Sequence, residues 1–138
     1  MRFRTTLFLS IGLFFITFFH GCKKSDTAST ISVSYQMLAN KTWYLDYKKA
    51  GTKTKTYIGQ PTYVINFLKN LTTSDSDGMT GTYTVELINN ELQIHVQAKT
   101  PKVNSIEYIY TIESIGVKNL ILSHVLNTDS TTLYFSTK

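Results

Sequence analysis

Few side chains in this chain of 138 residues have the types and spacing that a metal site or a catalytic site needs. Beyond the first 21 residues the histidines are His95 and His124, with no His-x-x-x-His pattern and no pair of cysteines, so we expect no zinc site. Asp75-Ser76-Asp77-Gly78 is similar to the start of a calcium loop, but its glycine comes fourth rather than sixth, which favours a turn. No Gly-x-Ser-x-Gly motif is present. We therefore expect neither an enzyme nor a bound cofactor or metal.

The aromatic side chains are the stronger candidates for a site. Six of them occupy alternate positions that we expect to face the interior of a sheet, and we predict them as ligand-binding residues: Trp43, Tyr63, Phe67, Tyr83, Tyr108 and Tyr110. The alternative is that these rings only fill the core. A buried tyrosine hydroxyl needs a hydrogen-bond partner, so several inward tyrosines predict an interior that is partly wet.

The basic residues give a weaker signal. Without residues 1–21, the chain has 12 lysines, 9 acids and no arginine. Arginine is the residue that reads phosphates and guanine edges in a bidentate manner, so we expect no nucleic-acid partner. Lys48, Lys49, Lys53 and Lys55 cluster in what we take as the first long loop, where they either bind an anionic membrane or glycan or are simply solvated.

The start of the chain has the layout of an export signal. Arg2 and Arg4 precede an apolar run of 13 residues, Leu7 to Phe19, which is short of the roughly 20 residues that span a bilayer as a helix. Cys22 ends this segment. We predict a signal peptide over residues 1–21, which leaves Cys22 at the start of the mature chain.

The segment around Cys22 resembles the lipobox of bacterial lipoproteins, with Gly21 before the cysteine and Lys23, Lys24, Ser25 and Asp26 after it. The resemblance implies that Cys22 carries acyl chains such as palmitate and that these chains are the contact with the membrane. Two or more acyl chains anchor a protein stably. Because the position after Cys22 is Lys23 rather than Asp, the resemblance implies the outer membrane, on its periplasmic side or at the cell surface.

The rest of the chain reads as one small domain after a tether. Hydrophobic residues make up 42% of the chain and prolines number 2, a composition that excludes disordered and fibrous classes. Residues 22–33 are small and polar, so we expect a lipidated cysteine and a tether there. The domain is predicted over residues 34–138, beginning with one or two helical turns at Ser34–Ala39.

Period-two alternation then dominates the domain. Trp43, Leu45 and Tyr47 share one face, and the same pattern predicts seven strands with an eighth compatible with Thr52–Ile58. Asn89-Asn90 fits a two-residue hairpin, whereas residues 70–79 are expected to form a polar loop. No helix is long enough to cover such a sheet, so we predict an all-β, antiparallel up-and-down barrel of seven or eight strands, with a β-sandwich as the alternative.

Short motifs of the domain resemble those of small lipocalin-like lipoproteins of Gram-negative bacteria. They are Met37–Leu45 with its tryptophan, Phe67–Asn70, and Gly81-Thr82-Tyr83-Thr84-Val85 followed by Leu92-Gln93-Ile94. Lys41 stands where the lipocalin signature has glycine, and the arginine that packs over the tryptophan in that family has no counterpart. The resemblance implies a lipid-anchored barrel that binds a small apolar or aromatic ligand. The competing hypothesis is a solid barrel that acts as a structural or interaction module for an envelope protein or glycan, and the oligomeric state stays open.

Overall fold

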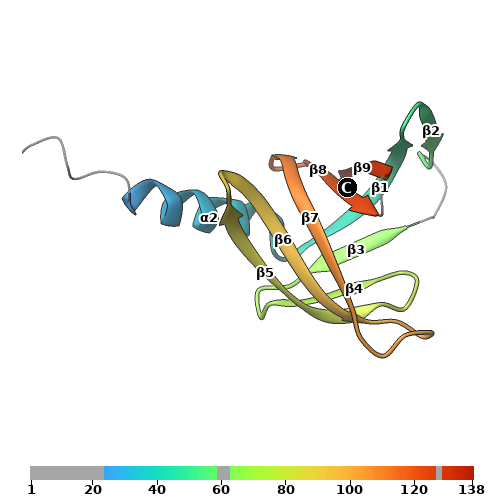
Figure 1. Ribbon diagram of the computed structural model, residues 1–138, viewed down its shortest axis with the longest axis horizontal. Helices are drawn as coiled ribbons and strands as arrows, with labels where there is room; N and C mark the ends of the chain where they lie inside the picture. Colours follow the sequence, from blue (N-terminus) through green and yellow to red (C-terminus); the bar gives the residue numbers. More distant parts are fainter. Residues whose placement is uncertain (1–23, 59–62, 127–128) are drawn as a thin grey trace, which may run out of the picture. The chain divides into compact units, whose positions relative to one another are not determined.

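The computed structural model describes residues 24–58, 63–126 and 129–138. The chain divides at Thr30 and Ile31, and the part from Ile31 to Lys138 is a compact unit. It holds the end of one helix and nine strands (Figure 1). The elements are α2 (Lys24–Leu38), β1 (Lys41–Ala50), β2 (Lys53–Thr56), β3 (Val64–Phe67), β4 (Thr72–Asp75), β5 (Thr80–Ile88), β6 (Glu91–Lys99), β7 (Ile106–Ile115), β8 (Asn119–Leu126) and β9 (Asp129–Ser136).

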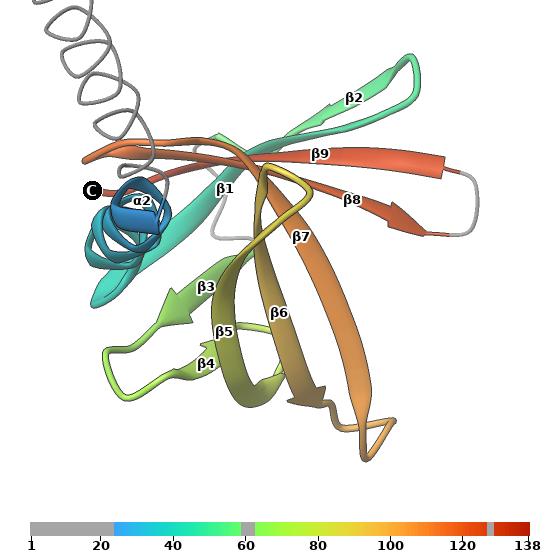
Figure 2. The same ribbon diagram turned by 60° about the vertical axis from the view of Figure 1, so that its left-hand side comes forward.

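Eight of the strands form a closed antiparallel barrel. Strands β3 to β9 pair in sequence order, β1 pairs with β3 through one edge, and its other edge pairs with β9 (Figure 2). This confirms the predicted all-β up-and-down barrel. Closure pairs the barrel strands with one another and buries an apolar core among the described residues without a covering helix.

Two strands differ from their predicted roles. The segment compatible with an eighth strand does form β2, but β2 pairs only with Tyr47–Ala50 of β1 and projects as a ribbon beyond the barrel (Figure 2). The eighth barrel strand is β4, which lies where we expected a polar loop. The sequence Thr72-Thr73-Ser74-Asp75 carries no apolar alternation, yet Thr73 is buried and its hydroxyl donates to the Asn66 carbonyl at 2.8 Å.

The helix is longer than predicted. It covers Lys24–Leu38, so residues 24–33 of the expected tether and the predicted boundary between residues 33 and 34 lie within it, while residues 22 and 23 lie outside the described residues. Asp26 lies in the first turn of this helix, where a negative charge is favourable because of the positive end of the helix dipole. Asn40 ends the helix with a φ of 57°, and its side-chain oxygen accepts the Lys69 amide at 3.1 Å. This described helix is too short and too polar to cross a membrane.

The predicted hairpin at Asn89-Asn90 is confirmed. Both residues have positive φ, 51° and 68°, and they join Ile88 of β5 to its partner Glu91 of β6. Gly81 of β5 is a second constrained position. A Cβ there would lie 2.2 Å from the Gln97 carbonyl oxygen, so β5 and β6 come too close at this point for any other residue.

Candidate functional site

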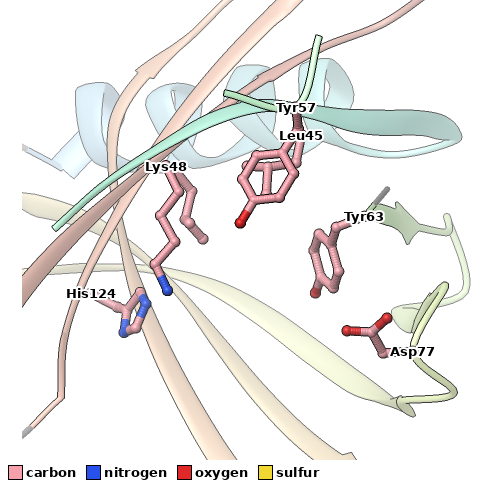
Figure 3. A pocket seen from close by; sticks show the side chains of 7 residues that line it. Leu45, Lys48, Tyr57, Tyr63, Asp77 and His124 are labelled. Atoms are coloured by element: carbon pink, nitrogen blue, oxygen red, sulfur yellow. The ribbon is translucent and has the colours of Figure 1, made fainter. Parts of the chain in front are cut away.

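The barrel interior opens into a pocket of about 460 Å³ at one end. We call it the mouth pocket, and Figure 3 shows most of the side chains around it. It is lined by Leu45, Lys48, Tyr57, Tyr63, Asp77, His124 and Leu133. Pockets of roughly 300–1,000 Å³ are the size that holds small organic ligands.

A β-bulge places Lys48 in the mouth pocket. The pairing of β1 with β9 shifts between Leu45 and Tyr47, so that Asp46 is the extra residue. Beyond the bulge Tyr47 lies opposite Tyr134, with the two rings stacked at 4.1 Å, and Lys48 lies opposite Leu133, which lines the pocket. The predicted common face for Trp43, Leu45 and Tyr47 is therefore wrong at Tyr47. A bulge turns the following side chains to the other face of the strand. Here it places Lys48, and not Tyr47, on the side of the pocket.

The same bulge fixes the two tyrosines beside Lys48. The Asp46 carbonyl accepts the Tyr57 amide at 2.6 Å, and the Leu45 amide donates to the Tyr63 carbonyl at 3.0 Å. The Asp46 carboxylate accepts the Ser136 hydroxyl at 3.0 Å, which ties the bulge to β9. Backbone hydrogen bonds thus fix the backbone of both tyrosines beside β1.

The wall opposite Lys48 carries an acidic side chain, Asp77 (Figure 3). The Tyr63 hydroxyl donates to Asp75 Oδ2 at 3.0 Å, and Asp75 Oδ1 accepts the amides of Asp77 and Met79 at 2.9 and 2.8 Å. These bonds confirm that Asp75–Gly78 is a turn, with Gly78 at a φ of 87°. Asp75 is engaged by three donors, whereas Asp77 is exposed at the pocket rim.

His124 faces Lys48 from β8. Its ring meets that of Tyr110 edge-on at 5.6 Å between centroids. Burial and the nearby Lys48 ammonium both lower the pKa of His124 below its ordinary value of 6.5. The imidazole is consequently neutral at pH 7, so one of its ring nitrogens donates a hydrogen bond and the other accepts one.

A second pocket of about 430 Å³ adjoins the first, because Tyr63 and Asp77 line both. We call it the side pocket; Tyr108, Tyr110, Met79 and Lys102 also line it. Burial, together with Tyr108 and Asp75, raises the pKa of Tyr110 to about 12. Burial and the neighbouring Tyr110 and Asp75 also raise the pKa of Tyr63, so both hydroxyls stay protonated across the physiological range.

The six aromatic residues predicted as ligand-binding fall into two groups. Tyr63, Tyr108 and Tyr110 line the pockets, as described. Trp43, Phe67 and Tyr83 line neither pocket and are almost fully buried, at 0%, 0% and 1% exposed. The Phe67 and Tyr83 rings meet edge-on at 5.0 Å.

Side chains and the end of the helix fill this second region, which we call the closed end. The Trp43 indole donates to the Leu38 carbonyl at 3.1 Å, and the Tyr83 hydroxyl donates to the Leu68 carbonyl at 2.9 Å. Lys41, the residue that departs from the lipocalin signature, places its ammonium 5.3 Å from the Trp43 ring centre and donates to the Val117 carbonyl. Every buried side-chain polar atom in the described residues has a partner.

Sequence reasoning missed Lys48, Tyr57, Asp77, His124 and Leu133 as residues of one site. Lys48 was expected in a loop, but it lies on β1, and the bulge that turns it inward has no marker in the sequence. The sequence presents His124 only as a possible metal ligand. Within the described ranges, no group of three or more His, Cys, Asp or Glu side chains is placed to hold a metal ion.

Cys22 and the predicted signal peptide lie outside the described residues. No protein-family profile, curated protein or solved structure matches the chain.

Proposed function

We propose that this protein is a non-enzymatic, lipid-anchored protein of the cell envelope whose barrel binds a small aromatic ligand in the mouth pocket. The observation that carries the proposal is the division of the interior. The closed end is filled by its own rings, while the mouth retains a pocket of about 460 Å³ between Tyr57, Tyr63 and Leu133.

The lining narrows the class of ligand. Leu45 and Leu133 supply apolar surface and the two tyrosines supply rings for stacking, whereas Lys48, His124 and Asp77 would be left desolvated by a wholly apolar molecule. An aromatic ring that also bears polar groups fits this lining better than a fatty acyl chain.

A calorimetric titration tests ligand binding, with 2-naphthamide as the probe and empty detergent micelles as the blank. The protein is used as the cell processes it, purified in a nonionic detergent. We expect binding that is abolished by Leu133→Trp, which fills the mouth pocket. Ile109→Trp is the matched control, because Ile109 is an exposed residue of the outer face. Equal heats from the parent and Leu133→Trp would remove the pocket from the proposal and favour the solid interaction module.

The membrane anchor is proposed from the lipobox-like segment and is tested separately. Wild-type cells fed labelled palmitate should label the protein and retain it in the membrane fraction, and Cys22→Ser should lose the label. An unlabelled wild-type protein would contradict the lipid anchor but would leave the proposal of ligand binding unchanged.

A further inference from the structure

The mouth pocket contains a positive charge that the protein does not neutralise. Lys48 is half-buried, and the one ion pair within 4.0 Å among the described residues joins His95 and Glu107, at 3.8 Å. Asp75 is engaged by the turn and Tyr63, and Asp77 lies on the far wall (Figure 3). The Lys48 ammonium therefore has no carboxylate partner in the described part of the chain.

Neighbouring groups strengthen the positive potential at this wall instead of offsetting it. Lys55 lies directly opposite Lys48 in the pairing of β1 with β2, and its ammonium is 5.0 Å from the centre of the Tyr57 ring. Like charges at opposed positions of two strands repel each other. The segment from Tyr47 to Tyr57 contains four lysines and no acidic residue.

His124 adds a hydrogen-bonding group to the same wall. Figure 3 shows its ring beside the Lys48 amine, and the Tyr110 ring packs edge-on with it. A cation and an imidazole side by side are a suitable pair for a carboxylate, since one neutralises the charge and the other donates a hydrogen bond. Asp77 on the far wall repels an anion. A negatively charged ligand is therefore oriented with its charge toward Lys48 and His124 and away from Asp77.

We infer that the ligand of the mouth pocket is an aromatic anion, which places its carboxylate between Lys48 and His124 and its ring between Tyr57 and Tyr63. This inference rests on the proposed function and narrows it to one class of molecule. Neutral aromatic molecules of the same shape would bind the rings alone and more weakly.

Two probes that differ only in charge test the inference, 2-naphthoate and 2-naphthamide, titrated by calorimetry into the detergent-purified protein. We expect 2-naphthoate to bind roughly tenfold more tightly, which is the usual contribution of a hydrogen-bonded charge. Lys48→Gln should remove that advantage, so that this variant binds 2-naphthoate and 2-naphthamide with equal affinity. Lys49→Gln is the matched control, because Lys49 is the exposed neighbour on the outer face, and it should change neither affinity by more than about twofold.

The pH dependence provides a second measurement that needs no variant. The titratable groups around His124 are Lys48 on β1, Tyr110 on β7, and Tyr57, Tyr63 and Asp77, which line the same pocket. A bound carboxylate favours the imidazolium, so the affinity for 2-naphthoate should rise as the pH falls below 6.5, with no such rise for 2-naphthamide.

The outcomes separate the two proposals. Equal affinities for both probes, or an advantage of 2-naphthoate that survives Lys48→Gln, would overturn the inference and leave the aromatic pocket in place. If neither probe binds, the proposed function fails and the inference fails with it.

Discussion

The two ends of the barrel use the same residue type for opposite purposes. At the closed end the Tyr83 hydroxyl is bonded to the Leu68 carbonyl and its ring packs on Phe67. In the side pocket next to the mouth pocket, Tyr110 is also inward and buried, but the structure gives its hydroxyl no hydrogen bond within the described residues. The comparison shows that an inward aromatic ring does not by itself mark a site. What marks it is whether open space remains beside the ring, as it does at Tyr63 and Tyr110 but not at Tyr83.

Deleting a ring at each end should give the largest contrast. Trp43→Ala removes a fully buried ring and its hydrogen bond to Leu38, and we expect the free energy of unfolding to fall by about 3–5 kcal/mol. Tyr108→Ala removes a half-buried ring beside the side pocket and should cost less than about 2 kcal/mol. Urea titrations followed by circular dichroism measure both. A comparable loss at both positions would show that the region of the side pocket is packed as tightly as the closed end.

Removing single hydroxyl groups sharpens the contrast. Tyr83→Phe should lower the free energy of unfolding by about 1 kcal/mol, because the hydrogen bond from the Tyr83 hydroxyl to the Leu68 carbonyl is lost. Tyr110→Phe should change it by no more than about 0.5 kcal/mol, since no internal hydrogen bond is lost. The same urea titrations apply. A larger loss for Tyr110→Phe than for Tyr83→Phe would reverse the assignment of the two ends.

The smallest expected effect is the response of the mouth to acid. The folded state lowers the pKa of His124, so below its ordinary value of 6.5 the unfolded chain binds the proton more readily. Stability should therefore fall as the pH decreases from about 6.5 through the lowered pKa, and His124→Gln should remove that part of the loss. Thermal unfolding of both proteins over this range measures it. His95→Gln is the control, since it leaves His124 in place; if it removes the same acid loss, the effect does not belong to the mouth.

The barrel could be predicted from the sequence because alternation and turn chemistry act locally. Asn89 and Asn90 tolerate positive φ, and they form the predicted hairpin. Strand β4 could not be predicted because its residues are polar. It is held by pairing with the adjacent strands β3 and β5 and by the buried Thr73 hydroxyl, which are contacts that leave no apolar pattern in the sequence.

The candidate site was harder to predict than the barrel. Tyr63, Tyr108 and Tyr110 were identified by their inward positions, whereas Lys48 depends on the bulge at Asp46. That bulge is tied to Ser136, 90 residues away in the sequence, so no local pattern announces it. The division of the aromatic residues between a filled and an open end likewise depends on where the helix ends at Leu38 and which rings it contacts.

A crystal structure of the protein with 2-naphthoate tests the central claim most directly, namely that the barrel interior is filled at one end and open to an aromatic anion at the other. We predict density for the naphthyl ring between Tyr57 and Tyr63, with its carboxylate within hydrogen-bonding distance of Lys48 and His124, and unchanged packing around Trp43. A mouth filled by the protein's own side chains, or 2-naphthoate bound only on the outer face, would contradict it.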